Sequence, residues 1–170
     1  TIEAGMSVAF VKEESAEAAS ETVIGERPVS PYPNLVTEAG FRQLENNLQV
    51  AIAACEAAEK FEDINERRRQ SALPLRDARY FAARVRSARV VEAATSNEVV
   101  AFGTTVTFQR NDGRVQTYRI VGEDEADPSS GTVSHSSPLM RSMMGKSVGE
   151  TVGTGQQEIE IVAIAIGQPN

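Results

Sequence analysis

Acidic side chains near the middle of the chain have the type and spacing that could hold a divalent metal ion. Carboxylate oxygens are the ligands that Mg²⁺ prefers in proteins. Asp63 and Glu66 are three residues apart, which would place both on one face of a helix. The same spacing also suits a solvated helix face on which Lys60 and Arg67 pair with these acids. We favour the solvated face, and we predict no metal, no cofactor and no catalytic residue in this chain.

A cationic stretch follows these acids and could bind a negatively charged partner. It contains five arginines within thirteen positions: Arg67, Arg68, Arg69, Arg76 and Arg79. Guanidinium groups in such a cluster could contact nucleic-acid phosphates or the acidic residues of a partner. The alternative is a solvated helix end without a partner.

Two polar clusters in the last third of the chain could bind a protein. The first is an acidic loop directly after an expected strand, with Glu123, Asp124, Glu125 and Asp127. Such a loop attracts a basic surface and speeds encounter, although many acidic loops are only solvated turns. The second is a turn with Ser134, Ser136, Ser137 and Pro138. Its alternative role is helix capping, with Ser136 or Ser137 as the N-cap and Pro138 in the first helical position.

We expect neither a reactive role for the single cysteine nor a catalytic role for the single histidine. Cys55 has no partner for an intramolecular disulfide or a cysteine-based zinc site, and it fits the seam of a helix as a small apolar residue. One cysteine in 170 residues suits a reducing cytoplasm, which is the localisation we expect. His135 lacks a nearby serine and aspartate arrangement, so we interpret it as an ordinary strand residue.

The elements that must position these residues are a helical hairpin and a β-rich domain. Residues 34–96 are predicted to form an antiparallel hairpin with Thr37 as N-cap. Apolar residues recur along its first helix at alternating gaps of three and four, namely Phe41, Leu44, Leu48, Ala51, Cys55 and Ala58. The second helix is expected to begin near Pro74 and to be shorter, with a stripe of Leu75, Ala78, Ala82, Val85 and Ala88.

Residues 97–170 are predicted to form four or five strands and one short helix. The run 111–113, Asn-Asp-Gly, is typical of a hairpin turn between two strands. The last strand is expected over 158–166 with Ile159, Ile161, Ala163 and Ala165 on one face. Residues 1–33 are acidic and contain few large apolar side chains, which predicts a flexible tail. Its apolar run Val8-Ala9-Phe10-Val11 is the exception and could dock on a neighbouring surface.

The charge distribution restricts the kind of partner. The chain has a net charge of −7, and an acidic protein lacks the basic face that tight direct DNA binding requires. No run of roughly 18 apolar residues is present, so we expect no membrane contact.

Three segments resemble the Gre family of bacterial transcription factors. The first segment is the C-terminal third of the chain. It contains VAFGTTVTF at 100–108 and YRIVGEDEAD at 118–127, followed by Gly131, Ser134, the run 137–139, Arg141, Gly145 and Gly149. The start of the hairpin, VTEAGFRQL at 36–44, and the run ARYFAAR at 78–84 also match. The resemblance covers about residues 35–166 and is most specific in the C-terminal part.

The resemblance implies both a fold and a partner. Gre proteins are α+β proteins in which an N-terminal antiparallel coiled-coil hairpin precedes a small FKBP-like β-rich domain. That domain docks on RNA polymerase at the secondary channel, and the hairpin enters the channel. By this resemblance the acidic loop and the serine turn are the polymerase-docking residues, and nucleic acid is reached only through the polymerase complex.

The tip motif of the family is altered here. Standard Gre factors present two metal-binding carboxylates in the motif GDLxENAEY. Matching residues 78–80 to its last three positions places Leu73 and Arg76 where the family has Asp and Glu, and Asp77 where it has Asn. The candidate tip residues are Leu73, Arg76 and Asp77, together with Asp63 and Glu66. An arginine in a metal-ligand position repels Mg²⁺ rather than binding it.

The sequence therefore predicts a transcription elongation factor of the Gre type that is not itself an enzyme. It is expected to bind bacterial RNA polymerase and modulate transcription without efficient stimulation of transcript cleavage. Two alternatives stay open: a true cleavage factor that uses displaced tip acids, and a coiled-coil adaptor that does not bind polymerase.

Overall fold

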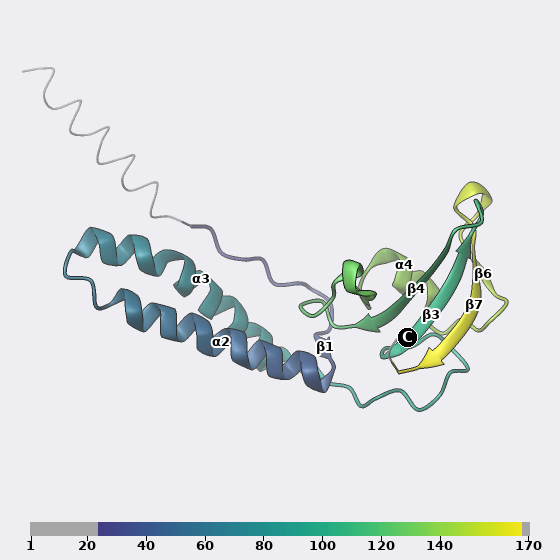
Figure 1. Cartoon of the computed structure of the whole chain (residues 1–170), viewed down its shortest axis with the longest axis horizontal. Helices are drawn as coiled ribbons and strands as arrows, with labels where there is room; N and C mark the ends of the chain where they lie inside the picture. Colours follow the sequence, from purple (N-terminus) through teal and green to yellow (C-terminus); the bar gives the residue numbers. More distant parts are fainter. Residues whose placement is uncertain (1–23, 168–170) are drawn as a thin grey trace, which may run out of the picture. The chain divides into compact units, whose positions relative to one another are not determined.

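The computed structural model describes residues 24–167 and consists of a helical hairpin followed by a β-rich domain (Figure 1). This confirms the predicted α+β class. The hairpin is built from α2 (Glu38–Ala58) and α3 (Ile64–Ser87), and short strands flank it, β1 (Leu35–Val36) and β2 (Arg89–Val90). The remaining elements are β3 (Thr104–Arg110), β4 (Val115–Val121), β5 (Thr132–Ser134), α4 (Pro138–Met143), β6 (Thr151–Val152) and β7 (Ile159–Ile166).

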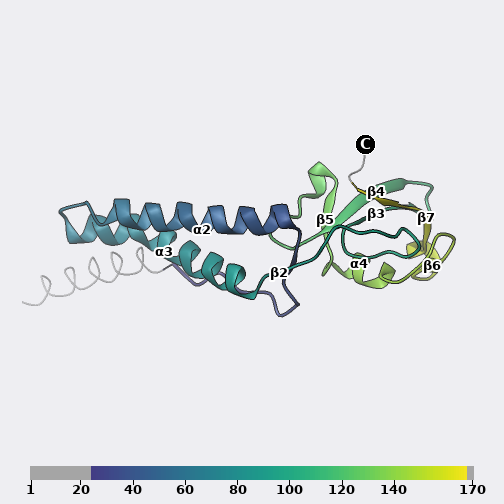
Figure 2. The ribbon, with the colours of Figure 1, turned by 90° about the horizontal axis from the view of Figure 1, so that it is seen from below.

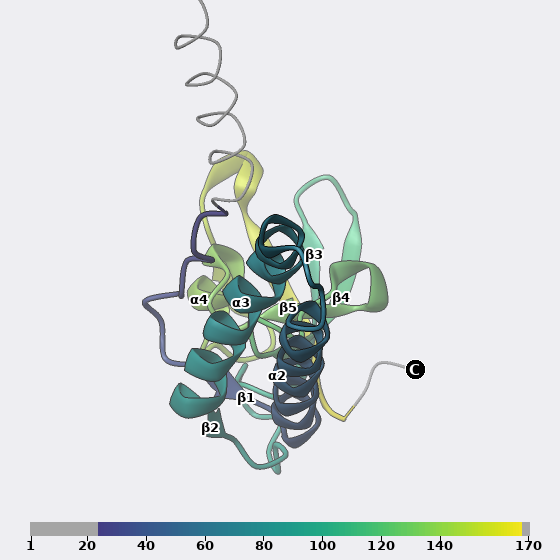
Figure 3. The same ribbon diagram turned by 90° about the vertical axis from the view of Figure 1, so that its left-hand side faces the viewer.

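The first helix begins and packs as the sequence predicts. Thr37 is its N-cap, because the backbone N–H of Gly40 donates to the Thr37 hydroxyl at 3.0 Å. The predicted seam is also confirmed: Leu44, Ala51 and Ala58 are buried, and the other seam residues are partly buried. Figure 3 looks along the hairpin and shows α2 and α3 side by side.

The second helix begins ten residues earlier than predicted. It starts at Ile64 and has 24 residues against 21 in α2, so the expectation of a shorter helix beginning near Pro74 is wrong. Pro74 lies inside the helix. Asp63 provides the start signal, because its carboxylate accepts from the backbone N–H groups of Asn65 and Glu66 at 3.3 and 3.2 Å. Residues 59–63 form the turn between the helices.

The strands at the base of the hairpin were not predicted. β1 and β2 pair in parallel, with Leu35 opposite Arg89 and Val36 opposite Val90. The Asn34 side-chain amide donates to the Ser87 hydroxyl at 3.2 Å beside this pair. The two ends of the hairpin are therefore held together by backbone pairing as well as by helix packing.

Five strands of the C-terminal region form one sheet in the order β5-β4-β3-β7-β6. β3 pairs antiparallel with β4 and with β7, whereas β5 runs parallel to β4, beside which it lies in Figure 2. The turn between β3 and β4 contains Gly113 at φ +87°, so the predicted hairpin turn is confirmed.

The core of this region lies between one face of the sheet and α4. It contains Val100, Val106, Phe108, Ile120, Met140, Met143, Val152, Ile159, Ile161 and Ile164. The predicted face of β7 is only half right, since Ile159 and Ile161 are buried but Ala163 and Ala165 are exposed. A β-bulge between Thr107 and Phe108 of β3 and their β7 partners shifts the alternation and turns Ile164 inward.

The compact units of the chain do not follow the helix ends. Residues 24–29 and 45–84 form one unit, and residues 30–44 and 85–167 form the other. The first turns of α2 and the last residues of α3 thus belong with the β-rich domain. None of the helices within residues 24–167 is long and apolar enough to cross a membrane.

Candidate functional site

The apex of the hairpin is a short turn fixed at both ends. The Arg67 guanidinium donates twice to the backbone carbonyl of Phe61, at 3.1 and 2.8 Å, and lies 4.0 Å from the Glu59 carboxylate. Asp63 caps the next helix from within the same turn. Capping of this kind orders a loop that would otherwise be mobile. Sequence reasoning treated Arg67 as part of a cationic cluster and missed this structural role.

The two candidate acids near the apex are already occupied by protein donors. Both oxygens of Asp63 accept backbone N–H groups. Glu66 accepts from the side chains of Gln70, at 2.8 Å, and Arg69. These hydrogen bonds, first from Gln70 and then from Arg69, lower the pKa of Glu66 below its usual value.

The structure gathers no further metal-ligating side chains around these two carboxylates in the part of the chain that it describes. No group of three or more His, Cys, Asp or Glu side chains in residues 24–167 is arranged to hold a metal ion. A metal ion at Asp63 and Glu66 would share these oxygens with the helix cap and with the Arg69 and Gln70 donors.

The three remaining candidate tip residues do not lie at the tip. Leu73, Arg76 and Asp77 lie inside α3, the first of them nine residues beyond its start. At 1.5 Å per residue, Arg76 is roughly 18 Å along the helix from Ile64. The placement of these three residues at the apex is therefore corrected, and Arg76 instead pairs with Asp77 at 3.1 Å.

Removal of the Asp63 cap tests the turn directly. Asp63→Ala is expected to lower the free energy of unfolding by about 1 kcal/mol, because two backbone N–H groups lose their acceptor. Asp63→Asn keeps an acceptor oxygen and should lose less than half of that amount. Urea denaturation of the three proteins measures both changes, and equal stability of wild type and Asp63→Ala would show that the cap contributes nothing.

The acidic loop and the serine turn lie next to each other because of the sheet topology. The loop follows β4 and the turn follows β5, and these strands are parallel neighbours with Val121 opposite Ser134. The ends of parallel neighbours meet at the same edge of a sheet. The backbone N–H of His135 also donates to the backbone carbonyl of Val121 at 3.0 Å. The structure thus brings together the two segments that the sequence singled out for docking.

Two acids of the loop have internal partners. Glu123 accepts from the Ser30 hydroxyl at 2.8 Å. Glu125 accepts from the backbone N–H and the hydroxyl of Thr37, at 3.2 and 2.6 Å. Both carboxylates, like that of Asp124, belong to half-buried residues. Glu125 therefore ties the start of α2 to the β-rich domain.

Asp127 is the most accessible acid of the loop. It caps a short 3-10 turn, Pro128–Ser130, and accepts from the hydroxyls of Ser129 and Ser130 at 2.6 and 2.7 Å. These bonds lower the pKa of Asp127 below its ordinary value, so this exposed side chain is charged at neutral pH.

The serine turn is a helix cap with an exposed proline. Ser137 is the N-cap of α4, accepting from the Met140 N–H at 3.4 Å, and Pro138 is the first helical residue. The capping role predicted for Ser137 and Pro138 is confirmed. The hydroxyls of Ser134 and Ser136 lie 2.8 Å apart, and Ser134 also accepts from the Ser136 N–H at 3.1 Å. Pro138 is exposed, whereas the three serines are half-buried.

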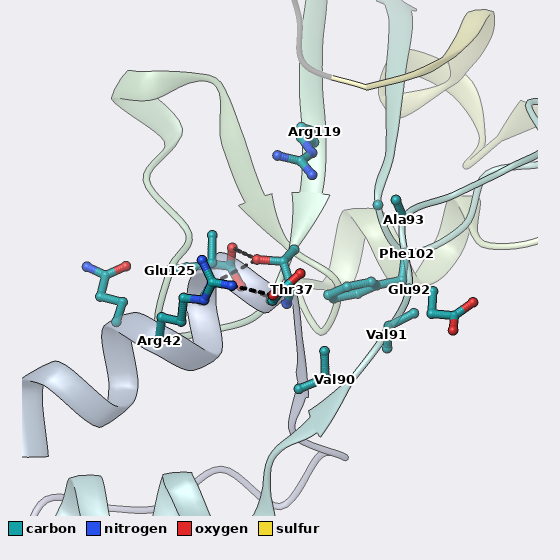
Figure 4. A pocket seen from close by; sticks show the side chains of 14 residues that line it. Thr37, Arg42, Val90, Val91, Glu92, Ala93, Phe102, Arg119 and Glu125 are labelled. Atoms are coloured by element: carbon teal, nitrogen blue, oxygen red, sulfur yellow. Dashed lines mark hydrogen bonds and ion pairs between the residues drawn. The ribbon is translucent and has the colours of Figure 1, made fainter.

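A pocket of about 620 Å³ lies where the start of α2 meets the β-rich domain (Figure 4). Its lining includes Thr37, Arg42, Phe102, Arg119 and Glu125. The Nε atom of Arg119 is buried and has no hydrogen-bond partner in the described part of the chain. Gly122 is next to this place, and a Cβ there would lie 2.6 Å from the Leu35 carbonyl oxygen. Glycine is therefore required for β1 to approach the loop so closely.

The serine turn also has neighbours that the sequence did not reveal. Arg141 of α4 donates to the Tyr32 hydroxyl at 2.6 Å, and its guanidinium lies 4.9 Å from the centre of the Tyr32 ring. Tyr32 belongs to the segment predicted as a flexible tail. Because these partners are over a hundred residues apart, no local signal could have identified them.

Comparison with known proteins gives consistent matches along most of the chain. Residues 95–166 match the family described as "Transcription elongation factor, GreA/GreB, C-term". Transcription elongation factor GreA of Bacillus cytotoxicus is 31% identical over 155 residues, which cover 78% of this chain and 96% of that protein. GreA of Solidesulfovibrio magneticus is 35% identical over 155 residues, covering 79% and 93%.

Other matches are shorter or more distant. GreA of Bacillus licheniformis is 41% identical over 87 residues, and here the aligned part of the chain spans only 55% of the relative's length. Among solved structures, GreA factor homolog 1 (Gfh1) of Thermus thermophilus is 22% identical, with 78% of this chain and 99% of that chain covered and a TM-score of 0.36.

Proposed function

The chain belongs to the GreA/GreB family of transcription elongation factors, and on this premise we propose that it binds bacterial RNA polymerase at the secondary channel. The polymerase-docking residues of this proposal are those of the acidic loop and the serine turn. Their location at one sheet edge supports it, since the ends of β4 and β5 present both segments together. The exposed and charged Asp127 and the exposed Pro138 are the most accessible members.

The hairpin is proposed to modulate transcription by occupying the channel, without efficient stimulation of transcript cleavage. The observation that carries this part is the engagement of the apex carboxylates. Asp63 is used as a helix cap, and Glu66 is bonded to Arg69 and Gln70. Two carboxylates with their own protein donors are poor ligands for an additional magnesium ion.

One feature favours a second candidate, a true cleavage factor with displaced acids. The turn at residues 59–63 brings Asp63 and Glu66 closer to the apex than a turn just before Pro74 would have done. Insertion into the polymerase would then have to break the local bonds of both side chains. Asp77, the third displaced acid considered from the sequence, lies well inside α3 and pairs with Arg76.

Docking is tested by charge reversal at the accessible acid. Asp127→Arg is expected to weaken binding to core RNA polymerase at least tenfold, because it replaces an attractive charge by a repulsive one at the docking edge. Binding is measured by titrating labelled protein with core enzyme at 0.1 M salt. The matched control is Asp112→Arg, which reverses another exposed aspartate, at the β3–β4 turn, and should change the affinity less than twofold.

The outcomes of this titration separate the alternatives. Absence of binding by the wild-type chain would favour the adaptor without polymerase binding and would contradict the proposed function. Equal weakening by both reversals would mean that the net charge matters and that the loop does not form the contact.

The cleavage assay decides between the two candidate functions. Added to backtracked elongation complexes, the wild-type chain is expected to leave the transcript length unchanged over the time in which an active GreA shortens it. Shortening by the wild type that is lost in Asp63→Ala and Glu66→Ala, but kept in Glu56→Ala, would establish a cleavage factor with displaced acids. Glu56 is the control because it is an exposed acid of α2.

A further inference from the structure

Residues 24–29, which we call the strap, are anchored on α3 by charged and aromatic contacts. The Arg27 guanidinium lies 3.9 Å from the centre of the Tyr80 ring and 5.1 Å from that of Phe81. It also pairs with the Asp77 carboxylate at 3.4 Å, and Glu26 pairs with Arg79 at 2.7 Å. Cation–π contacts combined with ion pairs fix the position of the strap along the helix.

An apolar groove lies between α2 and α3 beside the strap. It has a volume of about 320 Å³ and is lined by Arg27, Asn47, Val50, Ala51, Ala54, Leu73, Pro74, Asp77 and Phe81. Ala51 and Ala54 of α2 leave space that larger side chains at these positions would fill. Val50 and Leu73 are 61% and 46% exposed, respectively, so the groove leaves large apolar side chains uncovered. These two side chains give the groove an apolar wall that an apolar segment could cover.

We propose that this groove binds the chain's own N-terminal segment, with the apolar run Val8-Ala9-Phe10-Val11 as its occupant. Arg27 lines one edge of the groove, and residues 1–23 join the strap only three residues before Arg27 in the sequence. Phe10 is the one aromatic residue among residues 1–23, and its run holds three of the large apolar residues of that segment. An apolar run of this size matches a small groove walled by valine, leucine and phenylalanine.

Charge complementarity supports this occupant. Residues 1–23 contain five glutamates and one lysine, a net charge of −4. Helix α3 contains seven arginines against one glutamate and one aspartate, a net charge of +5. Attraction between these segments brings the acidic stretch 12–21 towards the arginine-rich helix when the apolar run is seated.

The connecting length is also suitable. Twelve residues separate Val11 from Ile24, and a flexible linker of that length spans roughly 20 Å on average. Binding within one chain then occurs at an effective concentration in the millimolar range, so a weak apolar contact is sufficient. A docked segment would cover part of the arginine-rich face of α3, which goes beyond the function proposed above.

Disulfide trapping in the full-length chain tests this. With the native thiol removed by Cys55→Ser, the pair Ala9→Cys and Ala54→Cys places one thiol in the run, beside Phe10, and one in the groove. The control pairs Ala9→Cys with Ala53→Cys, an exposed neighbour outside the groove lining. An intramolecular disulfide is expected to form at least tenfold faster in the first pair, and the ratio should fall in 0.5 M NaCl.

Two results of the trapping experiment would overturn the proposal. Equal rates for the two pairs would show that the run does not select the groove, and a disulfide formed mainly between molecules would assign the groove to a second copy. Hydrogen exchange provides a measurement without substitutions. Amides of residues 72–82 are expected to exchange at least threefold faster in a chain lacking residues 1–22, and unchanged exchange would also contradict the docking.

Discussion

Replacement of Phe108 by alanine is expected to lower the free energy of unfolding by about 3–5 kcal/mol, the largest effect of a single substitution that we predict. Phe108 is fully buried at the centre of the sheet, where its ring stacks on Tyr118 with 6.1 Å between ring centres. It also lies where β7 changes register, so neighbouring strands cannot close over the cavity without losing their pairing. Urea denaturation followed by circular dichroism measures this change.

The control for this prediction lies in the same sheet. Val162 of β7 is 44% exposed, and Val162→Ala is expected to change stability by less than about 0.5 kcal/mol. A loss below about 1.5 kcal/mol for Phe108→Ala would mean that the core collapses into the cavity. Such a result would contradict the rigid packing between the sheet and α4.

Local patterns were sufficient wherever the deciding contacts are local. Thr37 was identified as an N-cap because a cap acts within its own first turn, and Gly113 because its turn requires a positive φ. The seam of α2 followed from its apolar period. The C-terminal segments that resemble Gre factors were identified for the same reason, since motif and spacing are properties of the sequence itself.

The position of the hairpin turn shows where local signals compete. Pro74 is favourable at the first position of a helix, which suggested a start there. Asp63 is also a strong start signal, and the structure uses it. An internal proline removes one backbone hydrogen bond and typically costs about 3 kcal/mol. The longer α3 offsets this cost by packing additional turns against α2, which no single signal in the sequence expresses.

The candidate site shows a different limit. The acidic loop and the serine turn were found from their composition, but which acids are accessible depends on distant partners. Glu123 and Glu125 are bonded to Ser30 and Thr37, about 90 residues earlier in the chain. Asp127 is bonded within its own turn, through the nearby serines. In the sequence the four acids of the loop look equivalent, but in the structure they differ in exposure and in hydrogen-bond partners.

Glu125→Ala is the second substitution with a large expected effect. It leaves the backbone N–H and the hydroxyl of Thr37 without their acceptor at the point where α2 begins. Hydrogen bonds to a charged group contribute about 1.5–3 kcal/mol each, and this carboxylate is only half-buried. We expect a loss of about 2–3 kcal/mol in the free energy of unfolding, measured by urea denaturation.

A double-mutant cycle with Thr37→Val tests whether this loss comes from the contact itself. Both substitutions remove the hydrogen bond between the Thr37 hydroxyl and the Glu125 carboxylate, so together they should cost at least about 1 kcal/mol less than the sum of their separate effects. Additive effects would show that Glu125 acts through the Thr37 backbone N–H or through another contact. Polymerase binding distinguishes the roles further. Asp127→Arg should weaken it at least tenfold in a chain that remains folded, because it puts a repulsive charge on the exposed acid of the docking loop. Glu125→Ala removes a half-buried acid of the same loop and should weaken binding less than Asp127→Arg does.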